Sequence, residues 1–210
     1  MAKRHDSEYC GGMLILAFDT TAAACSVVLW RDGHVLHSAR AVMDYGQAEA
    51  LMPMIEETMA AAGFSYTDLD RIAVTIGPGS FTGVRVGLAA ARGIAMAADK
   101  PVIGVTTMDV LAHAVPENEL KDAAGIIVAI DTKRGDFFAQ KFTAGRDAIG
   151  EIVTLTPDEL KTWCGAGSWI LVTDALPDTV VLARVSATRL PQAGGPLPLY
   201  VHAPSVTMPS

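Results

Sequence analysis

The residues best suited to chemistry form one short glycine-rich loop. The loop reads Gly77, Pro78, Gly79, Ser80, Phe81, Thr82 and Gly83. It follows an apolar strand predicted over residues 71–76 and opens a helix predicted over residues 81–98. Backbone N–H groups left uncovered at a helix N-terminus attract an anion or an acidic partner. The loop lacks the Gly-Lys-Ser/Thr of a Walker A loop, and its third glycine falls one residue late for a dinucleotide fingerprint. It is therefore not a standard nucleotide site.

Two aspartates at the ends of two similar strands are the candidate acidic groups. Residues 14–20 read Leu-Ile-Leu-Ala-Phe-Asp-Thr, and residues 126–132 read Ile-Ile-Val-Ala-Ile-Asp-Thr. Asp19 and Asp131 each stand where a carboxylate can meet solvent or ligand. The threonines after the first aspartate are Thr20 and Thr21. Two interpretations stay open: the aspartates line the halves of a duplicated ligand cleft, or each one stabilises its own turn.

Ser80 is the candidate nucleophile, because it stands at a strand-to-helix turn that superficially resembles a nucleophile elbow. The surrounding residues do not have the Gly-x-Ser-x-Gly spacing, and none of the five histidines is an obvious base. A serine in this position also caps a helix, since its hydroxyl accepts a hydrogen bond from an unpaired N–H. We expect the capping role, and a peptidase-like hydrolase is the weakest of three functional hypotheses.

The elements that must position these residues follow the order of an RNase H-like unit. A hairpin turn at Asp32-Gly33 and a third strand over residues 35–42 follow the first two strands. A helix over residues 47–62 ends at Gly63. One strand precedes the helix over residues 81–98, and another follows it. The full order is three strands joined by hairpins, then a helix, a strand, a helix and a strand.

After Asp131 the sequence repeats only the beginning of this unit. It offers two or three strands, a helix over residues 157–163 and a strand over residues 169–173. We therefore expect a two-lobed α/β protein with a truncated second lobe. The predicted domains are a disordered extension over residues 1–12, a first lobe over residues 13–108 and a smaller lobe over residues 109–210.

The composition indicates which partners the chain can bind and in which compartment it works. The 210 residues are 50% hydrophobic and carry a net charge of −7, which disfavours tight binding of nucleic acid by this chain alone. The three cysteines form no Cys-x-x-Cys pair, as expected for reduced thiols in the cytoplasm. No apolar run reaches the roughly 18 residues of a membrane span, and the first dozen residues lack the apolar core of a secretory signal.

Two predicted helices have the features of a partner-binding surface. In the helix over residues 81–98, small residues recur every four positions and make one face nearly flat. This face can pack closely either on a partner or on the protein's own sheet. The same helix has two arginines seven residues apart, and the helix over residues 47–62 has more apolar residues than one inward face can hold. The predicted partner contacts are Leu51, Met52, Ile55, Met59, Gly83, Arg85, Gly87 and Arg92.

Four blocks of sequence have the order and spacing of one known family. They are residues 16–21 with 24–27, residues 77–87, residues 129–135 and residues 198–200. Together they resemble the TsaB (YeaZ) family from about residue 13 to residue 204. The resemblance implies the two-lobed actin-like, Hsp70-like ATPase fold. It also implies a non-catalytic role in the transfer of threonylcarbamoyl to adenosine 37 of tRNA.

The resemblance also implies partners. They are the catalytic subunit TsaD and the ATPase TsaE, with tRNA bound indirectly through the complex. In the family, the first helix and the helix after the glycine loop form the surface used for TsaD or for self-association, so a homodimer stays open. Gln47 and His202 depart from residues common in the family.

Compared with the relatives, the motifs for a metal site and a nucleotide site are degenerate in this sequence. The catalytic relative holds a metal with a His-x-x-x-His pair, and Thr107 and Leu111 occupy those positions here, with His113 alone nearby. Actin-like ATPases flank phosphates and Mg²⁺ with two hairpin turns, and residues 132–135 do not form the expected glycine-rich turn. The expected vestigial cleft consists of Asp19, Thr20, Thr21 and Asp131.

We therefore expect no metal and no cofactor bound by this chain alone, with ATP and Mg²⁺ left open at the interface of a complex. An ATP-dependent phosphotransferase of the actin and sugar-kinase class is the alternative function.

Overall fold

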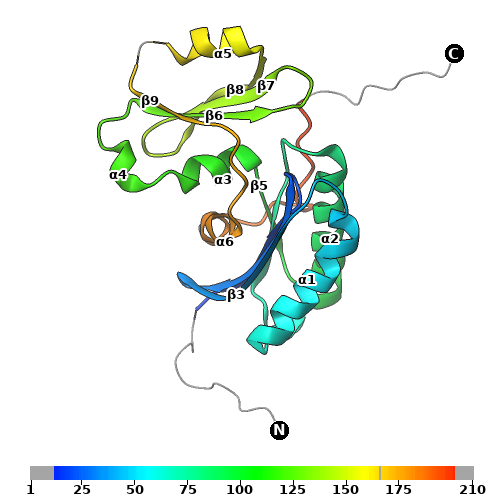
Figure 1. The fold of residues 1–210 in the computed structure, drawn as a ribbon. Helices are drawn as coiled ribbons and strands as arrows, with labels where there is room; N and C mark the ends of the chain where they lie inside the picture. The colour runs from blue at the N-terminus through cyan, green and yellow to red at the C-terminus, as the bar shows by residue number, and fades with distance from the viewer. Residues whose placement is uncertain (1–11, 166, 202–210) are drawn as a thin grey trace, which may run out of the picture.

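The computed structural model describes residues 12–165 and 167–201, which form two β-sheets with helices between and around them (Figure 1). Residues 1–11 of the predicted extension and His202 lie outside the described residues. Within the described part, no helix has the length and apolarity needed to cross a membrane.

The first sheet has five strands in the order β3-β2-β1-β4-β5. Its strands are β1 (Leu14–Asp19), β2 (Ala24–Arg31), β3 (His34–Val42), β4 (Arg71–Thr75) and β5 (Val102–Val105). The first three pair antiparallel, whereas β4 and β5 run parallel to β1. This confirms the RNase H-like order predicted from the hairpin turn and the later strand–helix alternation.

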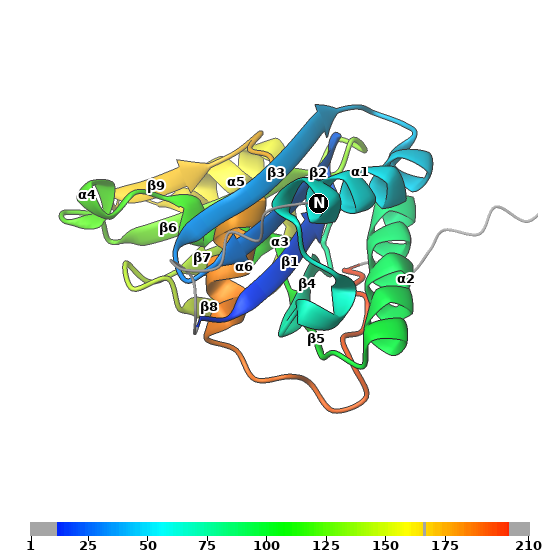
Figure 2. The ribbon, with the colours of Figure 1, turned by 90° about the horizontal axis from the view of Figure 1, so that it is seen from below.

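Helices cover both faces of the first sheet, because successive residues of β1 point to opposite faces. Leu14, Leu16 and Phe18 pack under two helices, and Ile15 and Ala17 pack on the other face under a third. Figure 2 shows the first pair on one side of the sheet and the third helix on the other. The pair is α1 (Gln47–Ala62) and α2 (Phe81–Ala98), and the third helix is α6 (Thr179–Ala187).

The second sheet has four strands in the order β8-β7-β6-β9. They are β6 (Gly125–Asp131), β7 (Phe137–Phe142), β8 (Ala148–Leu155) and β9 (Trp169–Val172). One face carries α5 (Pro157–Cys164), and α3 (Thr107–Ala114) packs on the other, between the two sheets (Figure 1). The short helices α4 (Glu117–Leu120) and η1 (Tyr66–Asp68) complete the described elements.

The last part of the chain returns to the first sheet, which sequence analysis did not foresee. Helix α6 packs on β1 and β2 although it follows the whole second sheet. Beyond α6, the backbone N–H of Leu199 donates to the Ile76 carbonyl at 2.8 Å. The Asp178 cap and the apolar positions of α6 were the local signal for this helix. The predicted lobe boundary at residue 108 lies inside α3.

Candidate functional site

Asp19 is the last residue of β1, the central strand of the first sheet, and its buried carboxyl is surrounded by hydroxyl groups. Its Oδ1 accepts hydrogen bonds from the Thr21 backbone N–H at 3.2 Å, the Thr21 hydroxyl at 2.6 Å and the Thr75 hydroxyl. Its Oδ2 is buried and has no hydrogen-bond partner among the described residues. Burial raises the pKa of this carboxyl, and the Thr21 and Thr75 hydrogen bonds oppose that rise.

The glycine loop lies directly on the turn that follows Asp19. The Thr20 hydroxyl donates to the Gly83 carbonyl at 2.7 Å, and the Ser80 N–H donates to the Thr21 carbonyl at 2.8 Å. A Cβ on Gly79 would lie 2.4 Å from the Thr21 carbonyl oxygen. Glycine is therefore required there because two backbone segments touch. The structure thus brings Asp19, Thr20 and Thr21 together with the glycine loop, a contact that sequence analysis did not foresee.

Ser80 caps α2, and the predicted role is confirmed. Its hydroxyl accepts a hydrogen bond from the Gly83 N–H at 3.2 Å. This bond satisfies one of the N–H groups that a helix start leaves unpaired.

Asp131 ends β6 and forms its bonds within its own turn. Its Oδ1 accepts from the Lys133 N–H at 2.7 Å, and its Oδ2 lies 3.0 Å from the Lys133 ammonium. These two hydrogen bonds hold the pKa of the Asp131 carboxyl below its usual range. The Thr132 hydroxyl donates to the carbonyl and carboxylate oxygens of Asp136 and accepts a hydrogen bond from the Arg134 N–H. No described hydrogen bond joins this turn to Asp19.

Each of the two turns has a backbone N–H group that already donates to its own aspartate. Phosphate cradles present free backbone N–H groups, whereas the Thr21 and Lys133 N–H groups are each bonded to a neighbouring aspartate. Each aspartate therefore accepts a hydrogen bond from its own turn, as the turn-stabilising interpretation expects. The unpartnered Oδ2 of Asp19 is the feature that this interpretation leaves unexplained.

The positions that hold a metal in the catalytic relative serve packing here. Thr107 begins α3, with its hydroxyl 3.3 Å from that of Thr21, and Leu111 is buried against the second sheet. The described residues contain no group of three His, Cys, Asp or Glu side chains placed to hold a metal ion.

Five of the predicted partner contacts are wrong, because the folded chain buries them. Leu51, Ile55 and Met59 lie in the core beneath α1. Gly83 and Gly87 face the protein's own sheet, where a Cβ on Gly87 would lie 2.9 Å from the Thr20 hydroxyl. The small residues of α2 therefore allow this helix to lie close to β1 and β4.

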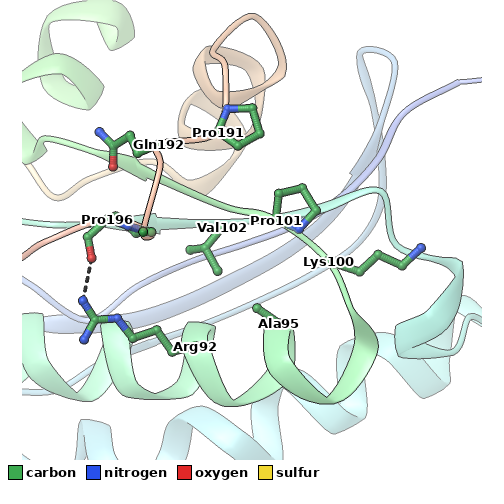
Figure 3. Close-up of a pocket in the computed structure, with 10 residues that line it drawn as sticks. Arg92, Ala95, Lys100, Pro101, Val102, Pro191, Gln192 and Pro196 are labelled. Atoms are coloured by element: carbon green, nitrogen blue, oxygen red, sulfur yellow. Dashed lines mark hydrogen bonds between the residues drawn. The ribbon is translucent and has the colours of Figure 1, made fainter.

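The remaining predicted contacts, Met52, Arg85 and Arg92, are exposed on α1 and α2. Met52 retains 37% of its accessible surface. Both arginines also bond the returning C-terminal segment, a contact that sequence analysis missed. The Arg85 Nε donates to the Tyr200 hydroxyl at 3.0 Å. The Arg92 Nη2 donates to the Pro196 carbonyl at 2.7 Å, as Figure 3 shows.

A hollow of about 300 Å³ separates α2 from this returning segment (Figure 3). Its lining includes the apolar residues Ala95, Pro101 and Val102 and the polar residues Lys100 and Gln192. Arg92 stands at one end with its guanidinium bonded to Pro196.

The two lobes define a protein of the actin-like ATPase fold class, with an aspartate ending the first strand of each sheet. A solved structure from Pseudomonas aeruginosa, described as an uncharacterized protein with similarity to peptidase YeaZ, has this fold. It matches 90% of this chain and 100% of its own, with a TM-score of 0.77 at 25% sequence identity.

Sequence comparisons identify the family. A family model described as TsaD, tRNA N6-adenosine threonylcarbamoyltransferase, matches residues 46–168. The tRNA threonylcarbamoyladenosine biosynthesis protein TsaB of Escherichia coli is 36% identical over 138 residues, and that of Haemophilus influenzae is 37% identical over 129. These matches cover 65% and 61% of this chain but only 58% and 53% of the relatives, little more than half of their length. The chain belongs to the TsaD-type family, on its TsaB (YeaZ) branch.

Proposed function

We propose that this chain is a non-catalytic subunit in the biosynthesis of threonylcarbamoyladenosine in tRNA. In this role it binds and supports the threonylcarbamoyltransferase subunit TsaD, together with the ATPase TsaE. The names of the TsaB relatives support the pathway. We propose that the chain works in the cytoplasm, together with the tRNA that the complex modifies.

The observation that carries the partner role is the surface of α1 and α2, which pack side by side. Every charged residue of α1 is acidic, and every charged residue of α2 is basic. These residues are Glu49, Glu56 and Glu57 on α1, and Arg85 and Arg92 on α2. All five are exposed. A surface with one acidic and one basic helix complements a second copy of itself, or a related chain, about a two-fold axis.

The hydrogen bonds of the two aspartate turns support the non-catalytic part of the proposal. We infer that the chain binds no nucleotide by itself and that any ATP and Mg²⁺ lie at the interface of the complex. The net charge of −7 supports tRNA binding through other subunits. The buried, unpartnered Oδ2 of Asp19 is the observation that favours the alternative, an ATP-dependent phosphotransferase.

Complex formation with TsaD of the same organism tests this proposal. The full chain and TsaD are mixed, and the molar mass of the eluting species is measured by size-exclusion chromatography with light scattering. The test variant combines Met52→Asp on α1 with Arg85→Glu on α2. The matched control combines Leu171→Asp and Arg134→Glu, which place an acidic residue at an exposed apolar position and at an exposed arginine of the second lobe.

A complex that forms with the wild type and the control but not with the test variant supports the proposal. No complex for the wild type, with or without ATP and TsaE, contradicts it. A micromolar dissociation constant for ATP with Mg²⁺ in a titration of the isolated chain would favour the phosphotransferase instead.

A further inference from the structure

Three residues from two distant parts of the chain form one exposed cluster at the start of α2. Phe81 and Arg85 are one helical turn apart, and Tyr200 comes from the returning C-terminal segment. The Arg85 guanidinium carbon lies 3.7 Å from the centre of the Phe81 ring, and the Phe81 and Tyr200 ring centres are 5.1 Å apart. The Tyr200 hydroxyl accepts the hydrogen bond from the Arg85 Nε. Arginine stacked on a ring in this way loses much of its rotational freedom.

The backbone before Tyr200 is itself held in place. Besides the Leu199 N–H bonded to Ile76, the Leu199 carbonyl oxygen lies against Gly77, where a Cβ would come within 2.7 Å. Gly77 has φ +101°, which also favours glycine. The Pro196 carbonyl accepts from Arg92. Tyr200 therefore reaches Arg85 from a fixed segment, so its hydroxyl defines the position of the guanidinium.

This arrangement leaves the outer edge of the guanidinium unused. The Arg85 Nε is bonded to Tyr200, whereas neither Nη nitrogen has a hydrogen-bond partner among the described residues. The two Nη groups of an oriented guanidinium match the two oxygens of a carboxylate. No acidic residue lies on α2 to compete for them, and the positive end of the helix dipole lies at the same end of α2.

Resting on the proposed function, we propose that Tyr200 is a positioning residue that holds Arg85 ready to bind a carboxylate of the partner protein. A single protein carboxylate fits better than an RNA backbone, because the three exposed glutamates of the neighbouring α1 repel a run of phosphates more strongly than one carboxylate. A partner helix with acidic residues, like α1 of this chain, has the required chemistry.

The test is a double-mutant cycle on the affinity for TsaD, with Tyr200→Phe, Arg85→Gln and the double variant. Tyr200→Phe removes one hydroxyl and keeps the ring, so we expect the dissociation constant to rise about 3- to 10-fold. Arg85→Gln should raise it by about 10-fold or more. The double variant should bind as Arg85→Gln does, because Tyr200 acts through Arg85.

Two further measurements separate positioning from a merely structural role. Arg85→Gln should flatten the dependence of the dissociation constant on salt concentration, since an ion pair is lost. Arg85→Lys should not restore the affinity, because an ammonium lacks the planar fork. Thermal unfolding midpoints are measured for every variant, and Arg134→Gln, which removes an exposed arginine of the second lobe, should change neither affinity nor its salt dependence.

Three results would overturn the inference. In the first, the wild-type chain binds TsaD, and Tyr200→Phe and Arg85→Gln bind it with unchanged affinity. This result would leave the proposed function standing. The second is additive effects in the double variant. The third is weaker binding of tRNA to the isolated variants with an unchanged protein complex, which would assign Arg85 to RNA. If the wild type forms no complex with TsaD, the proposed function fails first and this inference fails with it.

Discussion

Gly83 and Thr20 are in direct backbone contact, although they are 63 residues apart. The Thr20 hydroxyl donates to the Gly83 carbonyl at 2.7 Å, and a Cβ on Gly83 would lie 1.8 Å from the Thr20 carbonyl oxygen. The contact joins the glycine loop to the turn after β1. It therefore couples the start of α2 to the buried Asp19 site.

A methyl group at position 83 should force this contact apart. Gly83→Ala is expected to lower the free energy of unfolding by about 3 kcal/mol, at the upper end of the usual range for overpacking, because the obstructing atoms are backbone. Gly93→Ala is the matched control on the same helix, where a Cβ meets nothing within 4 Å. The control should raise stability by up to about 1 kcal/mol. Urea unfolding of both variants measures the difference, and equal stabilities would contradict the packing argument.

The cap on α2 gives a prediction that also bears on hydrolysis. Ser80→Ala should lower the free energy of unfolding by about 1 kcal/mol, because the Gly83 N–H loses its acceptor. Ser80→Asp keeps an acceptor at a helix start and should retain most of the wild-type stability. Thermal unfolding compares the two. Labelling of Ser80 by an acyl or phosphonate probe would contradict a role limited to capping.

The two described free cysteines should differ in reactivity. Burial raises the pKa of the Cys25 thiol to about 11, and the nearby Asp19 carboxylate adds to this rise. Cys25 is therefore a protonated, buried thiol at neutral pH, whereas Cys164 is partly exposed. A thiol reagent should modify Cys25 only on unfolding. The Cys25→Ser variant assigns the signal, and rapid native labelling lost in that variant would contradict the prediction.

His113 should make stability sensitive to mild acid. Burial lowers its pKa, although its bond to the Asp109 carbonyl and the Asp109 charge oppose this, and Arg146 and Arg189 add to the lowering. The unfolded chain therefore binds this proton at higher pH than the folded chain does. Stability must fall as pH drops through about 6.5 toward the lower folded pKa.

The comparison of wild type with His113→Gln isolates this contribution. Free energies of unfolding are measured between about pH 8 and pH 5, the range in which histidine titrates. The variant should lose less stability than the wild type on acidification. Parallel curves for the two proteins would show that His113 titrates alike in the folded and unfolded states.

Features set by a few neighbouring residues were predictable from the sequence. The Ser80 cap, the Asp32-Gly33 hairpin and the end of α1 at Gly63, which has φ +75°, all follow from short-range hydrogen bonds and backbone preference. The strand order of the first lobe also followed, because hairpins and crossovers restrict topology. The aspartate turns were recognised as candidates from their place at strand ends.

The direction in which an apolar face points was not predictable. Leu51, Ile55 and Met59 have the same periodic spacing whether they face a core or a partner, and the structure buries all three. The sequence around Asp19 did not indicate that Oδ1 would accept three hydrogen bonds while Oδ2 accepts none from the described residues. That asymmetry depends on Thr75, 56 residues away.

By itself, then, the sequence determined the local turns and caps, the first-lobe topology and the family resemblance, since these depend on patterns within short segments. Only the tertiary structure decided that α6 packs on the first sheet and that Tyr200 meets Arg85 across 115 residues. The physical reason is that burial and hydrogen bonding across such separations depend on how the whole chain packs, and no local pattern encodes which surfaces meet.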